Sequence, residues 1–407
     1  MIASDSLLSQ LIEQHQPGYS LSQPFYTRAE VFQHEANTYL KNQWHIAGHV
    51  SKVTNPGDYF LFKVMGEELI IIRDHDNQLN AFYNVCRHRG SRVCREKEGN
   101  KKALICPYHA WSYKLDGSLR HARLMKEDFN AGEFGLHRCQ LVELEGIILV
   151  CLGDEPETSP KEMAKNYTDA LQLHGIASAK ISSALELPTH ANWKLVVENF
   201  LECYHCAPAH HEYSAVHSRP KLLAVGAGEG SGPEGSYERF EPELIAWREQ
   251  AEKLGSPVFD ADKHQHVMRA PIKEGSLTES KDGQPVAPLM GSFKTIGYDG
   301  GVTAIAFNYC NYLIASNDHA IIFRFTPMSE LYSEVEAITL VDGDAVEGKD
   351  YIADKVSWVW DVTLAQDATI TEDNAVGILS RKYQPGPYST QENAIIDFYQ
   401  DYMSRIK

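Results

Sequence analysis

The sequence predicts an α+β protein in which a small antiparallel β domain is inserted near the N-terminus of a larger domain, itself an antiparallel sheet with helices. Two observations lead to this prediction. Short segments of alternating apolar and polar residues, separated by turn residues, fill positions 42–155, and similar strand-like segments return after residue 301 among helical stretches. We therefore divide the chain into an N-terminal arm and helix (1–41) that belong to the larger domain, the β domain (42–155), and the remainder (156–407).

The composition is that of a globular protein, with 43% hydrophobic and 23% charged residues. The 55 acidic residues outnumber the 38 basic ones, which argues against nucleic-acid binding because that function needs a basic face. The N-terminus lacks the pattern of a signal peptide, and no apolar run reaches the ~18–20 residues that span a bilayer. The cysteines are scattered without a disulfide framework. We expect a cytoplasmic protein with no membrane partner.

The β domain is predicted from its turns. The stretch GDYFLFKVMGEELIIIRDHDNQLNAFYNVC alternates in polarity and breaks at Met65-Gly66 and at Asp76-Asn77. A further hairpin is expected at Asp116-Gly117, and the last strand at residues 146–153.

Two loops of this domain carry mixed Cys-His pairs. They read Cys86-x-His88 and Cys106-x2-His109, with seventeen residues between the pairs. Two thiolates and two imidazoles at this spacing suit a [2Fe–2S] cluster in which two His replace two Cys on one iron. A structural zinc site is the alternative, but zinc spacings usually place both Cys in one pair and both His in the other.

The larger domain begins with a strand-like segment and a helix starting near Asn192. Residues 226–301 are polar and rich in Gly and Pro around one expected helix, PELIAWREQAEKLG, which suggests either a flap over the active site or a variable surface loop. Strand-like segments follow up to residue 343, and two helices close the chain. The last helix should bury a stripe formed by Ile395, Phe398, Tyr399 and Tyr402.

A second metal site is suggested by VVENFLECYHCAPAHHEY. His205 and His210 lie about 140° apart on a regular helix, so they converge on one metal only where the helix is distorted. Pro208 lies between them and cannot donate to the helical ladder, which provides such a distortion. His211 is a rival to His210, and two surface histidines on an ordinary helix are the simpler alternative.

The motifs C-x-H-R-G, C-P-Y-H-x-W, Asn192-Trp193-Lys194 and Glu202-x-Tyr204-His205 with His210 together resemble the Rieske non-heme iron oxygenases, large (alpha) subunit. The resemblance covers nearly the whole chain and is weakest at 226–301. It implies a helix-grip-like catalytic domain, and a mononuclear Fe(II) held by the two His and a distant Asp. The His-x4-His spacing selects His210 over His211. Cys203-x2-Cys206 could suggest a redox or zinc pair, but we interpret these two cysteines as helix-packing residues.

The third iron ligand is expected in LAQDATITEDNAVGILSRKYQPG, which offers Asp367, Glu372 and Asp373, with Asp361 upstream. In the family an Asp is followed by Ile or Leu after three residues, by Glu after two more, and then by Gly. Asp367 fits that frame, although Gln366 stands where Glu is frequent. We therefore assign Asp367.

The resemblance also implies a role for Glu202 and for oligomerisation. In the family the cluster of one subunit faces the iron of its neighbour in a head-to-tail ring, usually a homotrimer, and a carboxylate three residues before the first iron His bridges them. Glu in place of the more frequent Asp looks like the carnitine, choline and glycine betaine branch. No dinucleotide-binding fingerprint is visible, so electrons are expected from a separate NAD(P)H-dependent flavin/iron-sulfur reductase.

The expected reaction is O2-dependent hydroxylation of a small quaternary ammonium compound, with oxidative N-demethylation of glycine betaine or a similar betaine as the prediction. Aromatic faces would hold the ammonium group through cation–π contacts of roughly 0.5–2 kcal/mol each. Hydroxylation of an aromatic ring or aromatic acid is the alternative; a pure electron carrier and a zinc-binding scaffold are hypotheses of other classes. The candidate pocket residues are Phe200, Tyr204, Phe307, Tyr309 and Phe323, with Tyr312 and Phe325 beside them.

Overall fold

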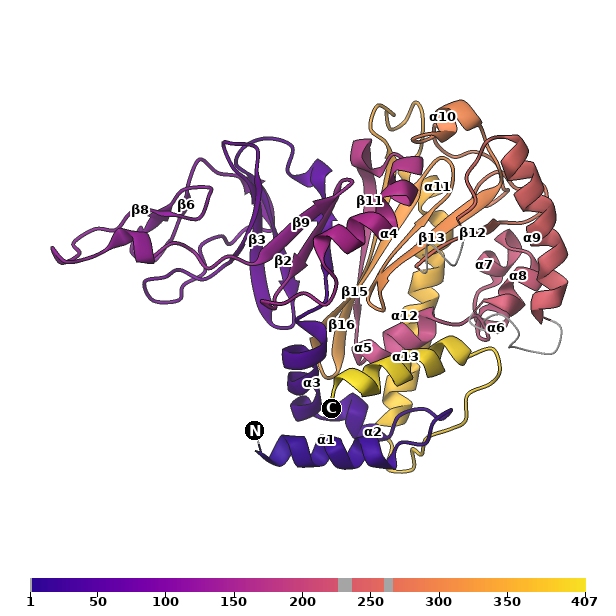
Figure 1. Cartoon of the computed structure of the whole chain (residues 1–407), viewed down its shortest axis with the longest axis horizontal. Helices are drawn as coiled ribbons and strands as arrows, with labels where there is room; N and C mark the ends of the chain where they lie inside the picture. The colour runs from indigo at the N-terminus through magenta and orange to yellow at the C-terminus, as the bar shows by residue number, and fades with distance from the viewer. Residues whose placement is uncertain (1, 226–235, 260–265) are drawn as a thin grey trace. The chain divides into compact units, whose positions relative to one another are not determined.

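The computed structural model describes residues 2–225, 236–259 and 266–407 of the chain (Figure 1). The chain forms two compact units, residues 42–160 and residues 1–41 together with 161–407. Both contain antiparallel sheets, so the predicted α+β class is confirmed. In the described part of the chain, no helix is both long and apolar enough to cross a membrane.

The unit of residues 42–160 consists of three small antiparallel sheets. The first has the order β1 (His45–His49), β10 (Ile147–Cys151) and β9 (Gln140–Leu144). The second is β4 (Leu79–Tyr83), β3 (Glu67–Arg73), β2 (Asp58–Val64) and β5 (Glu98–Asn100). The third is β6 (Leu104–Ile105), β7 (Ser112–Tyr113) and β8 (Leu119–His121). Short 3-10 turns occur at Val50–Lys52 and Ala131–Glu133.

The turns of this unit follow from its backbone requirements. Met65 and Gly66 connect β2 to β3 with φ of 51° and 82°, and Asn77 turns the chain toward β4 with φ of 60°. Positive φ is costly for most residues but accessible to Gly and Asn, which is why these dipeptides mark hairpins. A cluster of buried apolar residues in this unit includes Cys86 and Cys106, so the predicted cluster-binding loops pack directly on a hydrophobic core.

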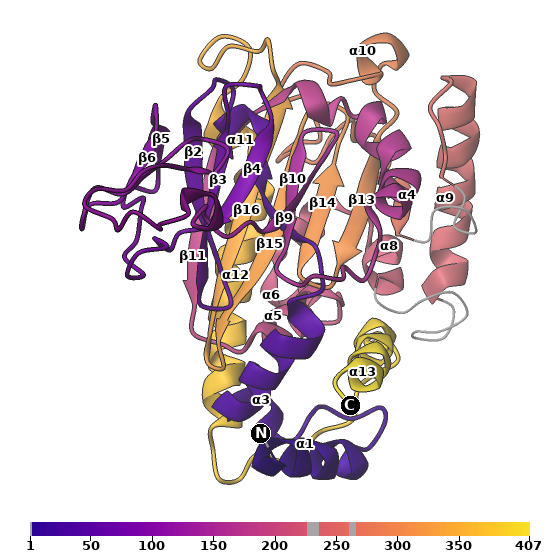
Figure 2. The same ribbon diagram turned by 60° about the vertical axis from the view of Figure 1, so that its left-hand side comes forward.

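The larger unit is built on one six-stranded antiparallel sheet, and Figure 2 shows β13 to β16 as neighbouring strands. Its order is β11 (Ala179–Thr189), β16 (Tyr332–Asp342), β15 (Ala320–Ser329), β14 (Asn311–Ala315), β13 (Gly301–Asn308) and β12 (Val267–Pro271). The strands that follow residue 301 in sequence are thus hydrogen-bonded neighbours.

The longest helix of this unit is α12 (Trp358–Ile378), which contacts β11, α5 and α7. The N-terminal helices are α1 (Ile2–Gln14), α2 (Gln23–Thr27), α3 (Ala29–Glu35) and a π-helical turn at Ala36–Leu40. The middle helices are α4 (Pro160–Leu173), α5 (Trp193–Phe200), α6 (Cys206–Ala209), α7 (His211–Val216), α8 (Arg219–Ala224) and α9 (Ser236–Lys253), with a 3-10 turn at Ile176–Ser178. The last are α10 (Phe293–Ile296), α11 (Ala353–Val356) and α13 (Asn393–Arg405).

Two expectations about this unit need revision. The N-terminal arm was expected to hold one helix, and it holds three with a π-helical turn. The stretch 226–301 is not a single excursion, because β12 within it is the edge strand of the main sheet and pairs with β13. Of that stretch, residues 226–235 and 260–265 lie outside the described residues, and the expected helix is found as α9.

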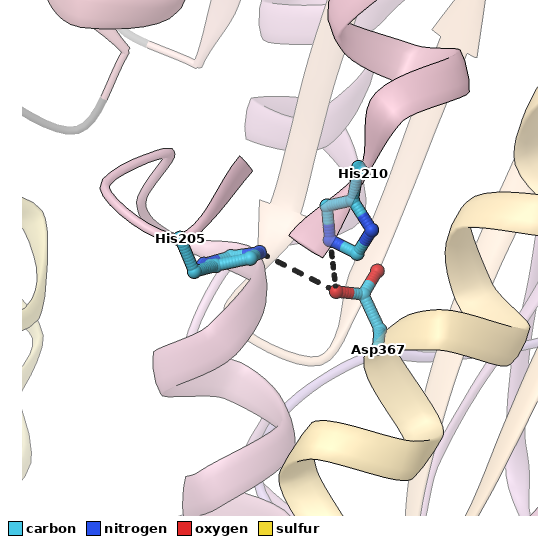
Figure 3. Close-up of side chains that lie close together, drawn as sticks. All are labelled: His205, His210 and Asp367. Carbon is cyan, nitrogen blue, oxygen red and sulfur yellow. Dashed lines mark ion pairs between the residues drawn. The ribbon is translucent and has the colours of Figure 1, made fainter. Parts of the chain in front are cut away.

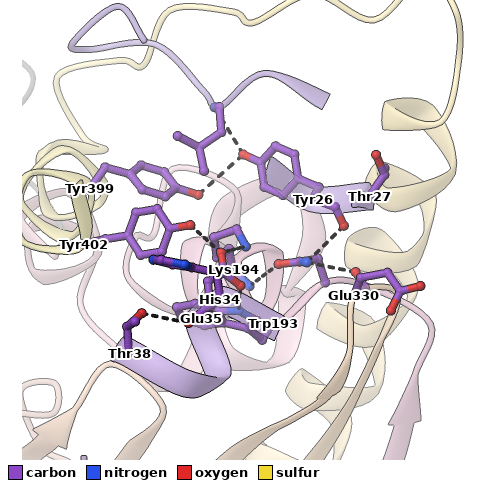
Figure 4. Close-up of polar contacts among 12 residues, drawn as sticks. Tyr26, Thr27, His34, Glu35, Thr38, Trp193, Lys194, Glu330, Tyr399 and Tyr402 are labelled. Atoms are coloured by element: carbon purple, nitrogen blue, oxygen red, sulfur yellow. Dashed lines mark hydrogen bonds and ion pairs between the residues drawn. The ribbon is translucent and has the colours of Figure 1, made fainter. Parts of the chain in front are cut away.

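The Asn192-Trp193-Lys194 motif connects α5 to α3 and to α13 (Figure 4). The Asn192 side chain caps α5 by accepting the Lys194 N–H. Glu35 of α3 accepts from the Trp193 ring N–H at 2.9 Å and pairs with the Lys194 ammonium at 2.6 Å. Tyr402 of α13 donates to the same carboxylate. A fully buried ion pair of this kind needs such additional donors to offset its desolvation.

Candidate metal centres and the cavity beside the iron site

The two predicted cluster loops adopt the same backbone turn. In the first, the Gly90 N–H donates to the Cys86 carbonyl at 2.9 Å, and in the second the Ala110 N–H donates to the Cys106 carbonyl at 3.1 Å. Gly90 and Ala110 both have positive φ, at 75° and 58°. The loops therefore present their Cys and His residues in equivalent ways.

The four predicted cluster ligands converge in pairs. Cys86 and Cys106 are buried, and their thiols contact each other. His88 and His109 lie nearer the surface, with their Nδ1 atoms 3.1 Å apart. Two facing sulfurs below two facing imidazole nitrogens are a donor set that fits the two irons of a Rieske-type [2Fe–2S] cluster.

Tyr113 supports this site from the neighbouring strand β7. Its hydroxyl accepts the Arg87 N–H at 3.0 Å and lies within hydrogen-bond distance of Cys86 Sγ, at 3.2 Å. Burial raises the pKa of Tyr113, so the phenol keeps its proton and remains a donor. A donor to a cluster sulfur is one of the means by which a protein adjusts the reduction potential.

The predicted distortion between His205 and His210 is an interruption of the helix. Helix α5 ends at Phe200, His205 precedes the single turn α6, and His210 connects α6 to α7 with φ −123° and ψ 79°. The two His side chains are thereby freed from the 140° separation of a regular helix. Pro208 lies within the short α6.

His205, His210 and Asp367 come together across more than 150 residues of sequence (Figure 3). Asp367 Oδ1 is 2.8 Å from His210 Nε2 and 3.4 Å from His205 Nε2. Asp367 lies on α12, whereas the two His come from the segment around α6. Within the described residues, no other group of three metal-ligating side chains comes together in this way.

The triad has the properties of a metal site and not those of a hydrogen-bonded cluster. His210 Nε2 and Asp367 Oδ1 are buried and have no hydrogen-bond partner, although they lie 2.8 Å apart. Unsatisfied buried polar atoms are rare because each costs a desolvation penalty. Two imidazole nitrogens and one carboxylate oxygen pointing at one space are the facial donor set of mononuclear non-heme iron.

The opposite nitrogen of each imidazole has its own acceptor. His205 Nδ1 lies 2.5 Å from Glu202 Oε1, and His210 Nδ1 lies 2.8 Å from Gln366 Oε1. Gln366 in turn donates to Glu212 at 3.0 Å. These contacts hold a proton on each Nδ1, so that in the neutral form of each imidazole the Nε2 lone pair points toward Asp367. Gln366, which departs from the family pattern, therefore keeps the acceptor that a Glu would supply.

The charges in the triad are mutually stabilised. Burial alone would lower the pKa of His205, but Asp367 and Glu202 raise it to about 9. Burial alone would likewise raise the pKa of Asp367, and the contacts with His205 and His210 hold it below its usual value. An imidazole that binds a metal must be neutral, so a bound metal cation would replace the additional proton that the raised pKa of His205 implies.

The rival ligands lie in other environments. Glu372 Oε1 accepts the His190 N–H at 2.7 Å, and Asp361 accepts from Ser357 at 2.5 Å. Asp373 is exposed. His211 begins α7 and is not part of the group formed by His205, His210 and Asp367.

A cavity of about 510 Å³ opens beside the triad, with His205, His210 and Asp367 in its wall. Of the predicted pocket residues, Phe200 lines it, as does Tyr312. The prediction was wrong for Tyr204, which is 58% exposed, and for Phe307, Tyr309 and Phe323, which are absent from the described lining. Phe307, Tyr309 and Phe323 pack against Tyr167, Phe398 and Trp360 respectively.

Several lining residues were missed from the sequence. Trp360 precedes Asp367 by two helical turns on α12, so helical periodicity was an available signal. The position of Glu279 had no such signal, because it comes from an irregular segment. The missed residues that bear on the chemistry are Asn199, Tyr213, Lys221, Glu279 and Trp360.

The two cysteines beside His205 also differ from expectation. Cys203 and Cys206 are buried against Leu222, as packing residues would be, but they are joined by a disulfide. Their Cα atoms are 4.8 Å apart, within the range that a disulfide spans. The expectation that the cysteines form no disulfide is therefore wrong for this pair.

The comparisons with known proteins agree with both sites. Residues 43–140 match the Rieske [2Fe-2S] domain family, and residues 176–407 match the ring hydroxylating alpha subunit (catalytic domain) family. The glycine betaine monooxygenase oxygenase subunit of Chromohalobacter salexigens is 32% identical over 98% of this chain and 88% of its own length. The carnitine monooxygenase oxygenase subunit of Acinetobacter pittii is 38% identical over 46% of this chain and 51% of its own.

The fold is also that of a solved structure. A quaternary ammonium Rieske monooxygenase crystallised with L-carnitine superimposes with a TM-score of 0.70 over 98% of both chains, at 21% sequence identity.

Proposed function

Because the chain belongs to the Rieske oxygenase alpha subunits, oxidoreductases with a [2Fe–2S] cluster and a mononuclear iron, we propose that it N-demethylates glycine betaine or a similar betaine. The observation that carries the proposal is end-to-end similarity to a glycine betaine monooxygenase oxygenase subunit, combined with a cavity beside the triad that is lined by both aromatic and charged side chains. The family excludes the hypotheses of a pure electron carrier and of a zinc-binding scaffold.

The reaction is a monooxygenation. One N-methyl group, dioxygen, two electrons and two protons give an N-hydroxymethyl group and water. The hydroxymethyl group then leaves as formaldehyde with loss of one proton, and glycine betaine becomes dimethylglycine. When bound, the mononuclear iron supplies dioxygen activation, and the Rieske cluster supplies electrons one at a time.

The residues of the chain provide holding and orientation. Glu202 and Gln366 fix the two His rings with their Nε2 atoms toward Asp367. Phe200, Tyr312 and Trp360 line the cavity, and the face of an aromatic ring attracts an ammonium group.

Electron supply and assembly complete the proposal. We infer a separate NAD(P)H-dependent flavin/iron-sulfur reductase, which the family implies. We also infer a head-to-tail homotrimer in which Glu202 bridges to the cluster of a neighbouring subunit. In support, the Glu202 carboxylate already lies 2.5 Å from Nδ1 of the predicted iron ligand His205. A cytoplasmic location stays a prediction.

The test is a turnover screen with purified enzyme and a competent reductase. Glycine betaine, carnitine, choline and aromatic acids are compared for oxygen uptake and for formaldehyde. We expect one formaldehyde per dioxygen with glycine betaine or another betaine. Coupled uptake only with an aromatic acid would replace the proposal by aromatic hydroxylation.

A further inference from the structure

Lys221 is a buried cation in the wall of the iron cavity. It lies on α8, is 6% exposed, and lines the same cavity as His205 and Asp367. Removing an ammonium from water is costly unless an anion compensates it. Its surroundings therefore indicate what the position is for.

The contacts of Lys221 leave its charge without a direct counter-ion. Its Nζ lies 3.2 Å from Nδ1 of His217, an imidazole whose pKa is lowered by burial and by Lys221 itself. In the part of the chain that the structure describes, no carboxylate forms an ion pair with it. Glu279 and Glu243 attract it only from a greater distance. One of the three ammonium donors is thus used within the protein.

The other buried cations of the unit are paired. Lys194 contacts the Glu35 carboxylate at 2.6 Å, and Arg269, also in the cavity wall, contacts Asp299 at 2.8 Å. Arg248 lines the cavity too, but it is exposed. Lys221 is therefore the buried cation of this wall that has donors to spare. Although burial lowers the pKa of Lys221 to about 8, the ammonium form prevails at neutral pH.

An opposite charge lies in the same wall. Glu279 is 3% exposed, 3.2 Å from His217 Nε2, and faces the ring N–H of Trp360 at 3.4 Å. The Trp360 and Tyr213 rings lie beside it with their centroids 5.3 Å apart. Aromatic faces near a carboxylate suit a quaternary ammonium group. The wall thus offers separate places for the two charges of a zwitterion.

We propose that Lys221 binds the carboxylate of the substrate and so makes the enzyme specific for betaines over carboxylate-free amines such as choline. The inference rests on the proposed function, since it assigns one end of the proposed substrate to one side chain. A charged hydrogen bond of this kind should change affinity about 10- to 100-fold.

The test uses four ligands that differ in one charge at a time. Glycine betaine carries both charges, and 3,3-dimethylbutanoate keeps the carboxylate but replaces the ammonium by carbon. Choline keeps the ammonium without a carboxylate, and 3,3-dimethylbutanol has neither charge. Binding to the metal-loaded enzyme under nitrogen is measured by calorimetry, so that no turnover is needed.

The variants are Lys221→Met, Lys221→Arg and, as a matched control, Lys273→Met. Lys273 is an exposed lysine whose Nζ donates to the Ala215 carbonyl at 3.1 Å, outside the cavity wall. We expect Lys221→Met to weaken the binding of glycine betaine and 3,3-dimethylbutanoate about 10- to 100-fold, while the affinity for choline changes less than twofold. Lys221→Arg should restore part of the loss, and the control should match the wild type.

Equal weakening of all four ligands by Lys221→Met, without recovery in Lys221→Arg, would show a structural role and overturn the proposal. Unchanged binding of 3,3-dimethylbutanoate would overturn it as well. Failure of the proposed function would give a different result. In the turnover screen no betaine would release formaldehyde, while in the calorimetry the binding of carboxylate ligands would still depend on Lys221.

Discussion

The imidazole rings of His205 and His210 are each fixed by an acceptor on the nitrogen that faces away from Asp367. Glu202 is local to His205, whereas Gln366 reaches His210 from another helix. Groups that hold a metal ligand in this way typically change metal affinity or activity 10- to 100-fold when they are lost. Residues that never touch the metal therefore decide how well the site is formed.

This argument predicts the effect of changing Gln366. Gln366→Met removes the acceptor for His210 Nδ1 at similar side-chain length, so iron affinity should fall about 10- to 100-fold. Gln366→Glu keeps the acceptor and should retain the metal. Iron content after dialysis against graded chelator measures both. Equal iron retention in Gln366→Met and the wild type would remove this role.

A second prediction at this scale concerns Tyr113. Tyr113→Phe deletes the hydroxyl beside Cys86 Sγ, and with it a hydrogen bond that favours the reduced, more negative cluster. A bond of about 1 kcal/mol corresponds to roughly 40 mV for one electron, so the potential should drop by on the order of that amount. Redox titration of the Rieske signal measures the shift. An unchanged potential with the cluster intact would contradict the assigned donor.

The site residues could be read from the sequence only where the signal was local. Two mixed Cys-His pairs and the His-x4-His spacing were visible as motifs, and the Asp367 frame came from the family pattern. The pocket aromatics were mostly mispredicted, because which side chains reach the cavity depends on the packing of the helices against the sheet. Lys221 and Glu279 had no local signal, since only tertiary packing brings them to the triad.

Among the elements, α5 is the one that positions the iron site. It starts at a cap provided by Asn192 and ends at Phe200, five residues before His205. Its buried face carries Lys194 and Glu198, which bond to helices from both ends of the sequence. The family motif N-W-K thus has a structural role, because it holds α5 against helices from both ends of the sequence. Helical periodicity alone could not predict these contacts.

The pH dependence of stability should report on Glu198. Burial raises its pKa to about 7, against the opposing donors Tyr399, Tyr26 and Lys194. The usual value in an unfolded chain is about 4.3. The folded state therefore binds more protons between these values, so stability is greatest at low pH and is lost as the pH rises through about 7.

Glu198→Gln removes this titration while it keeps an oxygen for Tyr26 and Tyr399. We expect the stability difference between pH 5 and pH 8 to shrink, by about 3 kcal/mol at most. Urea denaturation at a series of pH values measures it, with exposed Glu241→Gln as the control. A parallel pH profile for wild type and Glu198→Gln would contradict the assignment.

At the scale of the whole molecule, the proposal makes function depend on assembly. The fold class and both cofactors could be predicted because the cluster motif and the iron motif occupy separate parts of the sequence. The predicted division of the chain also lies within five residues of the two units that the structure forms. The return of β12 from the polar stretch to the sheet could not be predicted, because it depends on long-range strand pairing.

Electron transfer between subunits is tested by complementation. His205→Ala should lose mononuclear iron and turnover but keep its cluster, and His88→Ala should lose the Rieske signal but keep the iron site. Each variant alone should be inactive. Coexpressed with distinct tags and purified as mixed oligomers, the two should regain a measurable fraction of turnover. Inactive mixed oligomers with both metals present would contradict transfer between subunits.

The central claim is that the cluster transfers its electron to the His205, His210 and Asp367 site, where it is used for N-demethylation. Single turnover tests it most directly: reduced enzyme is mixed with dioxygen and glycine betaine, and cluster reoxidation and formaldehyde are followed together. We predict that the cluster oxidises rapidly only with the betaine present and that formaldehyde forms in proportion. Cluster oxidation at the same rate without betaine, or with no formaldehyde, would contradict the account.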